Sequence, residues 1–297
     1  MSKFNRLGLG TVQFGMNYGV ANVNGQLAPS EISAILVRAA SAGVQVLDTA
    51  AAYGDSEQTL GQCLDASMDF RLITKTIPLR QSAIGKNELG KISEAFEGSL
   101  IKLRRNQVDT LMVHHAEDLL VHGGDSIFFK LQEWKASGLI KKIGVSVYDR
   151  KQIDQLFERF DFDVVQLPFS VYDQRLLQDG TLARLASAGV EIHARSVFLQ
   201  GVLLMPSSRL PRHLATFVDH HERYLAYLKS TQVTPLEAAI SFVNQCPEIS
   251  VALVGVSSAR DFDECISAFS YEQTLDLADF AIFDTRLIDP RTWQAEA

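Results

Sequence analysis

Residues 47–57, Leu47-Asp48-Thr49-Ala50-Ala51-Ala52-Tyr53-Gly54-Asp55-Ser56-Glu57, place an acid and a phenol just beyond a short apolar run that starts at Val44. The run predicts a buried strand at 44–47, so that Asp48 stands at its carboxyl end and Tyr53 lies in the loop that follows. In α/β folds, this edge of the sheet is where catalytic groups are placed. An acid that closes a strand is also a common turn or cap residue, so the stretch alone leaves both interpretations open.

Two further strand-like segments end in side chains that can take part in catalysis. Residues 71–75 end in Lys75, and residues 110–114 end in His114. Because parallel strands present their carboxyl ends at the same edge, we expect Asp48, Tyr53, Lys75 and His114 to gather there.

The chain alternates short apolar strands with amphipathic helices and shows no change of composition that would mark a linker. Strands are predicted at 7–11, 44–47, 70–75, 108–114, 139–146, 163–167, 190–195 and 249–255. Helices are predicted at 29–42, 56–66, 87–104, 125–137, 150–159, 179–188, 234–245 and 259–269. A Gly-rich loop is expected at 13–19, a longer interruption with a His-rich helix at about 202–233, an extra helix at about 276–288, and a short tail after residue 288.

Eight strands, each followed by a helix, favour an α/β fold of the (β/α)₈ TIM barrel type in a single domain. A doubly wound open sheet is the alternative that periodicity does not exclude.

Composition limits the classes of partner. A net charge of −7 without blocks of like charge argues against nucleic acid or an anionic membrane as the main partner. Residues 1–6 carry no signal-peptide core, and no run approaches the roughly 18 apolar residues of a membrane span, so we expect a cytoplasmic protein. Cys63, Cys246 and Cys265 are few and widely spaced, which suggests small buried hydrophobes rather than disulfides or a zinc site.

The run Asp48-Thr49-x-x-x-Tyr53-Gly54-x-x-Glu57, with Lys75 and His114 closing the next two strands, resembles the aldo-keto reductase superfamily, and further matches extend along nearly the whole chain. The resemblance implies a (β/α)₈ barrel that binds a nicotinamide cofactor without a Rossmann domain and reduces carbonyls. It also implies a catalytic tetrad of Asp48, Tyr53, Lys75 and His114. The Rossmann fingerprint itself fails, because Gln13 occupies the position of the third glycine.

These four residue types suit carbonyl reduction. A tyrosine can protonate a developing alkoxide, but its reference pKa of about 10 is high for proton exchange at neutral pH. A neighbouring ammonium lowers that pKa, and a carboxylate holds the ammonium in place. Tyr53 is therefore the expected general acid/base, with Lys75 and Asp48 in support, and His114 is expected to direct the carbonyl oxygen as a neutral donor.

His115 competes with His114 for the last role, because adjacent strand residues point to opposite faces. The family pattern aligns with Val113-His114, so the role goes to His114. His115 then takes a position that is expected to line the substrate pocket.

The resemblance also assigns a set of cofactor contacts. Residues 143–146 resemble the fifth-strand motif whose Ser146 acts with Gln166 on the nicotinamide carboxamide, although Val147 stands where that motif has Asn. Residues 195–201 resemble the pyrophosphate loop, and Arg195 takes the place of an aromatic that stacks on the nicotinamide, which a planar guanidinium can also do. The expected cofactor-binding residues are Thr11, Asp48, Ser146, Gln166, Arg195, Ser196, Phe198, Gln200, Gly201, Gly255, Ser257, Ser258 and Glu264.

Residues 254–260, with Glu264, resemble the adenosine-binding segment after the eighth strand, where hydroxyls and a helix N-terminus face the ribose phosphate. Cys265 replaces the common Asn of this segment. Ser257, Ser258 and Arg260 are candidates to bind a 2′-phosphate, which favours NADP(H), with NAD(H) as the alternative. For Arg260, a position that faces solvent on the helix is an equal alternative.

The sequence thus predicts an NADP-dependent oxidoreductase that acts on a small aldehyde, ketone or sugar, or runs the reverse reaction. A cofactor-binding regulatory or scaffold barrel with little turnover is a second hypothesis, and an isomerase or lyase barrel without a redox role is a third. Substrate choice is expected to depend on loops near 14–24, 115–124 and 200–212, and the sequence indicates neither the substrate nor the oligomeric state.

No metal site is predicted. His220-His221-Glu222 invites a metal interpretation, but neighbouring residues on a helix point about 100° apart. We expect a solvated helix face there.

Overall fold

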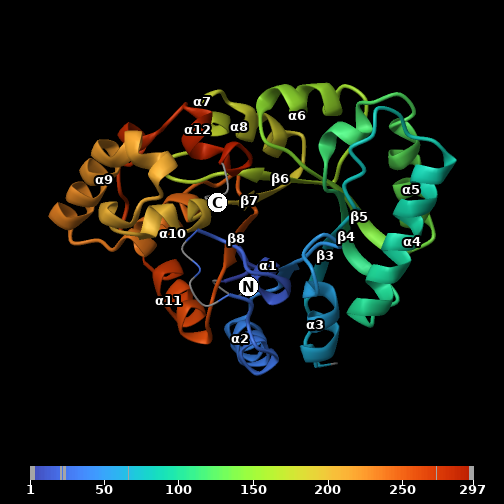
Figure 1. Ribbon diagram of the computed structural model, residues 1–297, viewed down its shortest axis with the longest axis horizontal. Helices are drawn as coiled ribbons and strands as arrows, with labels where there is room; N and C mark the ends of the chain where they lie inside the picture. The colour runs from blue at the N-terminus through green and yellow to red at the C-terminus, as the bar shows by residue number, and fades with distance from the viewer. Residues whose placement is uncertain (1–3, 21, 23–24, 66, 272, 294–297) are drawn as a thin grey trace.

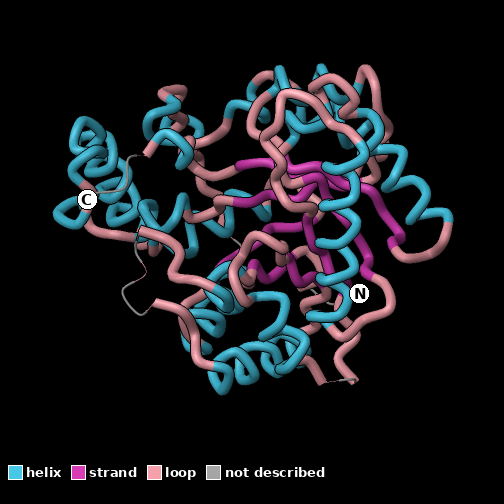
Figure 2. Tube along the Cα trace, turned by 45° about the vertical axis from the view of Figure 1, so that its right-hand side comes forward, coloured by secondary structure: helices cyan, strands magenta, loops and turns pink. Residues whose placement is uncertain are grey.

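The computed structural model describes residues 4–20, 22, 25–65, 67–271 and 273–293. Eight parallel strands close into a barrel in which each strand pairs with the next and β8 pairs with β1. The strands are β1 (Leu7–Gly10), β2 (Val46–Asp48), β3 (Arg71–Lys75), β4 (Val108–Val113), β5 (Ile140–Ser146), β6 (Val164–Pro168), β7 (Glu191–Arg195) and β8 (Val251–Gly255). Helices surround this central group of strands (Figures 1 and 2). The (β/α)₈ barrel is confirmed, and the open-sheet alternative is wrong.

One helix follows each strand on the outside of the barrel. These helices are α2 (Pro29–Ala42), α3 (Ser56–Cys63), α4 (Lys86–Leu103), α5 (Asp125–Ala136), α6 (Arg150–Phe157), α8 (Thr181–Ser187), α10 (Pro235–Asn244) and α11 (Ala259–Phe269). Their ends follow local sequence: Pro29 opens α2 and Gly43, at φ 83°, ends it, while a Thr234–Glu237 capping box opens α10. No helix in the described ranges is long and apolar enough to cross a membrane.

Alternation along the strands separates two apolar regions. Leu47 and Leu72 belong to the large cluster that packs under the helices, whereas their neighbours Val46 and Ile73 belong to a small separate cluster. That small cluster draws its other members from β4, β6 and β8, and is completed by Met112, Val164, Val251 and Leu253. It therefore fills the barrel interior, since successive strand residues face opposite sides.

The amino-terminal end of the barrel holds an ionic cluster around Glu191. Its carboxylate accepts hydrogen bonds from Arg71 at 3.1 Å and from His193 at 2.8 Å, and it also pairs with Lys142. Burial acts to raise the pKa of Glu191, but His193 and Lys142 outweigh burial and lower it. The cluster lies where the strands begin, and Asp48 and Lys75 lie at the opposite end of the barrel. Its role is therefore in the structure of the barrel and not at the end that carries Asp48 and Lys75.

Residues 276–288 do not form the predicted single helix. The chain makes a 3₁₀ turn at Ala278–Phe280 and a short helix, α12, at Thr285–Ile288. The reason is a long-range hydrogen bond: the backbone N–H of Ile282 donates to the carbonyl of Tyr172 at 2.8 Å. The side chain of Asp284 then caps α12 as a new helix.

Other predicted boundaries shift locally. Residues 13–19 are not wholly a loop, because Val12–Gly15 forms the short helix α1. The helix predicted at 179–188 begins at Thr181, after Gly180 at φ 75° separates it from α7 (Arg175–Gln178). The predicted end of helix 56–66, at residue 66, and parts of the 14–24 loop at residues 21, 23 and 24 lie outside the described residues.

The predicted His-rich helix is α9 (Val218–Thr231), but the expectation of a solvated face is wrong for His221, which is 1% exposed. Its Nε2–H donates to the carbonyl of Met205 at 2.8 Å, so its Nδ1 accepts from the Tyr172 hydroxyl at 2.7 Å. Burial lowers the pKa of His221. Through these two hydrogen bonds, His221 links Tyr172 in the segment after β6 to Met205 in the segment after β7.

Two expectations about metal ligands and cysteines can be compared with the structure. Within the described part of the chain, no group of three or more His, Cys, Asp or Glu side chains is placed to hold a metal ion. Cys246 and Cys265 are buried, as expected of small hydrophobes, whereas Cys63 is half-buried.

Candidate active site

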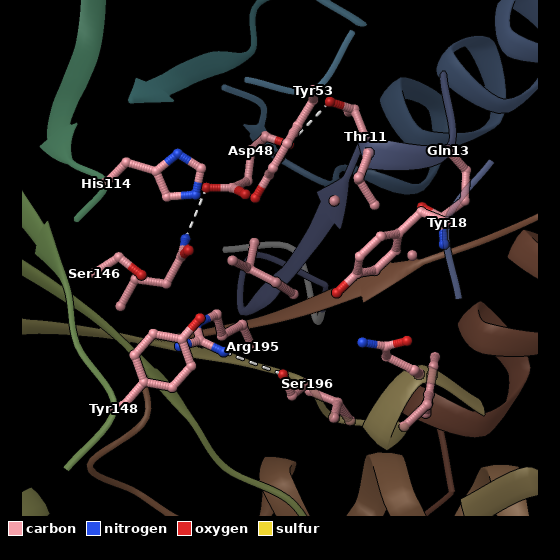
Figure 3. Close-up of a pocket in the computed structure, with 18 residues that line it drawn as sticks. Thr11, Gln13, Tyr18, Asp48, Tyr53, His114, Ser146, Tyr148, Arg195 and Ser196 are labelled. Atoms are coloured by element: carbon pink, nitrogen blue, oxygen red, sulfur yellow. Dashed lines mark hydrogen bonds between the residues drawn. The ribbon is translucent and has the colours of Figure 1, made fainter. Parts of the chain in front are cut away.

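A cavity of about 300 Å³ opens at the carboxyl end of the barrel, where the strands deliver most of the predicted site residues (Figure 3). Thr11 follows β1, Tyr53 follows β2, and His114 follows β4. Further lining comes from β5, β6, β7 and β8 through Ser146, Gln166, Arg195 and Gly255.

Lys75 lies beneath this cavity with its side chain fully buried. Its ammonium donates to Asp48 Oδ2 at 2.7 Å, to the carbonyl of Thr49 at 2.9 Å and to the Tyr53 hydroxyl at 3.5 Å. All three donors of the ammonium are thus used. Burial acts to lower the pKa of Lys75, but the charge of Asp48 and the hydrogen bonds to Asp48 and Tyr53 raise it overall, so the ammonium keeps its proton at neutral pH.

Asp48 is held from two sides. While Oδ2 accepts from Lys75, Oδ1 accepts from the side-chain amide of Gln166 at 2.7 Å (Figure 3). Gln166 was predicted to bind a cofactor carboxamide, and the structure shows that its amide nitrogen is already bonded to Asp48.

Tyr53 lies at the cavity with its ring in edge-on contact with His114, the ring centroids being 5.8 Å apart at 87°. Burial raises the pKa of the phenol, while Lys75 and Arg195 oppose that shift, and the net direction is upward. From the sequence, the Lys75 ammonium was expected to determine the direction of this pKa shift. Burial sets it instead, so Tyr53 holds its proton at neutral pH.

His114 is neutral under ordinary conditions. Burial, followed by the positive charges of Lys75 and Arg195, lowers its pKa from 6.5 to about 3. Its Nδ1 is buried and has no hydrogen-bond partner in the structure. His115 faces elsewhere: its ring bonds Asp118 at 3.1 Å, and it is not among the residues that line the cavity.

Two glycines fix the loop that carries Tyr53. A Cβ built on Gly15 would lie 1.9 Å from the carbonyl oxygen of Tyr53 and 2.3 Å from the nitrogen of Ser56. Gly54 adopts φ 56°, and its own Cβ would lie 2.4 Å from the carbonyl oxygen of Gly15. Only glycine permits this approach of α1 to the Tyr53 loop.

Arg195 ends β7 and stacks on an aromatic ring that the sequence did not single out. Its guanidinium lies 4.1 Å from the ring centroid of Tyr148 and donates to the carbonyl of Val147 at 3.1 Å. Arg291 contacts the same ring at 3.4 Å. The Val147 position thus contributes its backbone oxygen to the site.

The segment after β7 is conformationally strained. Ser196, Leu199 and Gln200 all have positive φ values, at 59°, 48° and 54°, and Gly201 follows at 95°. Left-handed conformations of non-glycine residues are costly and gather at ligand-binding sites. Ser196, Phe198 and Gln200 line the cavity, whereas Gly201 completes the turn without lining it.

A second cavity of about 300 Å³ adjoins the first, and the two share Gln13, Tyr18, Phe198, Gln200 and Gly255. Ser257 and Glu264 line it, as predicted for the adenosine side, and so does Asp261. Ser258 lines neither cavity, because its hydroxyl caps α11.

Several residues that line this cleft were not among the site residues predicted from the sequence. Gln13, Tyr18, Tyr148 and Asp261 all line one or both cavities. The signal was available for Tyr148, which follows a strand end by two residues, and for Tyr18, which lies in the Gly-rich stretch after β1.

A family model described as the Aldo/keto reductase family matches residues 6–287. The chain belongs to the aldo/keto reductase family. The resemblance read from the tetrad and the cofactor segments is thereby confirmed, and the barrel topology agrees with it.

This aldo/keto reductase is similar in sequence to reductases from other organisms. It is 26% identical over 216 residues to the NADH-specific methylglyoxal reductase of Escherichia coli, a match that covers 67% of this chain and 65% of that protein. It is 26% identical over 255 residues to the 6-dehydroglucose reductase of Novosphingobium aromaticivorans, covering 80% and 79%.

In fold it is similar to the aldo-keto reductase AKR11C1 of Bacillus halodurans in its holo form, with a TM-score of 0.74, 19% identity and coverage of 95% and 94%. An aldo/keto reductase of Klebsiella pneumoniae in complex with NADP and acetate has a TM-score of 0.68 at 20% identity, covering 95% and 91%.

Proposed function

We propose that this protein is an NAD(P)H-dependent oxidoreductase that reduces the carbonyl of a small aldehyde, ketone or sugar, or runs the reverse reaction, with Tyr53 as general acid/base. The observation that carries the proposal is the buried Lys75 ammonium, which bonds both the Asp48 carboxylate and the Tyr53 hydroxyl beneath the cavity. His114 stands beside the phenol as a neutral imidazole.

The cleft fits a nicotinamide dinucleotide, either NADP(H) or NAD(H). Two adjoining cavities that share five residues suit a ligand with two ends. Gln13 lines both cavities, and its buried Oε1 has no hydrogen-bond partner in the structure, which leaves an acceptor for a ligand donor. Ser146 and Arg195 would hold the end near the tetrad, and Ser196, Gln200 and Gly255 the stretch between the ends.

When bound, the reduced dinucleotide supplies a hydride to the carbonyl carbon. Tyr53 gives its phenolic proton to the carbonyl oxygen, which becomes the alcohol hydroxyl, and Lys75 stabilises the phenolate left behind. His114, held neutral by its lowered pKa, donates a hydrogen bond to the same oxygen and orients the substrate. Asp48 and Gln166 keep Lys75 directed at the phenol.

The proposed substrate class rests on the site and on the relatives together. The cavity is small and combines polar tetrad atoms with aromatic and aliphatic lining. The two relatives are named for methylglyoxal and for 6-dehydroglucose, one a small dicarbonyl and the other a sugar carbonyl.

The test is Tyr53→Phe, which removes one oxygen and keeps the ring. A positioned general acid contributes about 10²–10⁴ in rate, so kcat should fall by that order while dinucleotide affinity and thermal stability stay close to those of the parent. Tyr227→Phe is the matched control, since Tyr227 lies in α9 and lines neither cavity.

Near-parental turnover by a folded Tyr53→Phe protein would refute the acid/base assignment. Failure of the parent to bind either dinucleotide would refute the oxidoreductase proposal, and binding without turnover across a carbonyl panel would favour the regulatory barrel instead.

A further inference from the structure

The second cavity carries charges that discriminate between the two dinucleotides. Among the described residues that line it, the charged side chains are Asp261 and Glu264, and both are acids. NADPH differs from NADH by a phosphate on the 2′-oxygen of the adenosine ribose. An acidic lining disfavours that phosphate, because like charges brought together at a binding site repel each other.

Arg260, the cation that sequence placed near a 2′-phosphate, is directed elsewhere. Its guanidinium bonds Glu264 at 2.9 Å across one helical turn, and its side chain is 86% exposed. It is not among the residues that line the second cavity. The pair leaves no surplus positive charge to receive a phosphate.

Three backbone donors at the start of α11 are also occupied. The N–H of Ser257 donates to Asp261 Oδ2 at 3.0 Å, and the N–H of Asp261 donates to the Ser258 hydroxyl at 3.0 Å. The N–H of Ala259 donates to Glu31 Oε1, which reaches over from α2. A helix N-terminus binds phosphate through such N–H groups, and here side chains of the protein already accept hydrogen bonds from these three.

The same carboxylates suit a ribose that carries a free 2′-hydroxyl. A hydroxyl donates a hydrogen bond that an Asp or Glu carboxylate accepts, which is the chemistry by which an acid selects NAD over NADP in other dinucleotide sites. Asp261 is well placed for this role, because it is half-buried, lines the cavity and is held in position by the Ser257 N–H.

We infer that this cleft binds NADH in preference to NADPH, with Asp261 as the main selecting residue and Glu264 as a weaker one. The inference rests on the proposed function, since it assigns the adenosine end of the dinucleotide to the second cavity. It replaces the phosphate-binding role expected of Ser257, Ser258 and Arg260 with a discriminating role for the two acids.

The experiment is to titrate the purified protein with NADH and with NADPH, following fluorescence quenching or calorimetric heat. The parent should bind NADH about tenfold or more tightly than NADPH, a ratio typical of one unfavourable charge contact. Asp261→Asn keeps the side-chain shape and an acceptor for the Ser257 N–H. It should therefore narrow the ratio of NADH affinity to NADPH affinity, chiefly by strengthening NADPH binding. Glu264→Gln should act in the same direction with a smaller effect, because Glu264 is half exposed and paired with Arg260.

Asp263→Asn is the matched control, since Asp263 lies on the same helix but pairs with Arg38 and lines neither cavity. It removes one negative charge from α11 and should leave the ratio unchanged. The inference is overturned if the parent binds NADPH as tightly as NADH, or if folded Asp261→Asn and Glu264→Gln proteins keep the parental ratio. If the parent binds neither dinucleotide, the proposed function fails instead, so the two failures are distinguishable.

Discussion

His114 should make the protein sensitive to acid, because the fold accepts its imidazole only in the neutral form. Burial and the nearby charges of Lys75 and Arg195 lower its pKa to about 3, whereas the unfolded chain has the ordinary value of 6.5. Below pH 6.5 the imidazole therefore binds a proton in the unfolded state but not in the folded state. The stabilisation from the neutral imidazole is complete above that pH and is lost as the pH falls toward 3.

The size of this effect follows from the two pKa values. Between pH 6.5 and 4.5 the difference in bound protons rises from about one half to nearly one, and one proton over one pH unit corresponds to about 1.4 kcal/mol. The partial exposure of the ring reduces the result, so we expect a loss of about 2 kcal/mol. Since domains of this kind have about 5–15 kcal/mol of stability in total, the loss is measurable.

The assay is urea unfolding at several pH values for the parent and for His114→Gln, whose side chain does not titrate. Comparing the two proteins cancels the other titrating groups, and the variant should become more stable relative to the parent by about 2 kcal/mol between pH 6.5 and 4.5. His122→Gln is the control, because it makes the same substitution at an exposed histidine that does not line the cavity. Parallel pH profiles for parent and His114→Gln would show that the folded protein tolerates a protonated His114, and the neutral-donor role would be lost with it.

Two further substitutions test the surroundings of the tetrad. Arg195→Ala should weaken dinucleotide binding by roughly tenfold, because the guanidinium faces the cavity. The thermal unfolding midpoint should stay near that of the parent. An unchanged dinucleotide affinity in titration would refute the stacking role of Arg195. Gly15→Ala should lower the free energy of unfolding by about 1–3 kcal/mol and reduce kcat, because the added Cβ displaces the Tyr53 loop. Gly90→Ala is the control and should do neither, since its Cβ would meet no atom within 4 Å. Equal urea unfolding profiles for the two variants would contradict the close approach of Gly15 to the Tyr53 loop.

Much of the barrel could be predicted because its determinants are local. Each strand is a short apolar run with both faces covered, so it stands out against the amphipathic helices that follow. Asp48, Lys75 and His114 stand at or just beyond strand ends, and closure of the barrel brings such positions to one edge whatever their distance along the chain. Spacing alone was therefore informative about where these side chains meet.

The features that sequence missed depend on partners far away in the chain. Nothing between residues 276 and 288 predicts that the N–H of Ile282 will donate to Tyr172, a bond that one continuous helix would not allow. His221 has the neighbours of a surface residue, and only the packing of α9 against the segments containing Tyr172 and Met205 reveals it as buried. The pairing of Arg260 with Glu264 is local, yet its consequence for the second cavity needs the position of α11 relative to the barrel.

Tyr53 shows why the sign of a pKa shift also lies beyond sequence. Lys75 lowers the pKa of a neighbouring phenol in any context, and that rule predicted the direction correctly for the charge alone. Burial acts on the same hydroxyl in the opposite sense and outweighs the ammonium, since Asp48 neutralises much of the charge of Lys75. Under the proposed function, the phenol would consequently enter the reaction protonated, as the acid that carbonyl reduction requires. The reverse oxidation requires the phenolate, so its rate should rise with pH through and beyond neutrality, whereas reduction should be insensitive to pH until the phenol itself ionises.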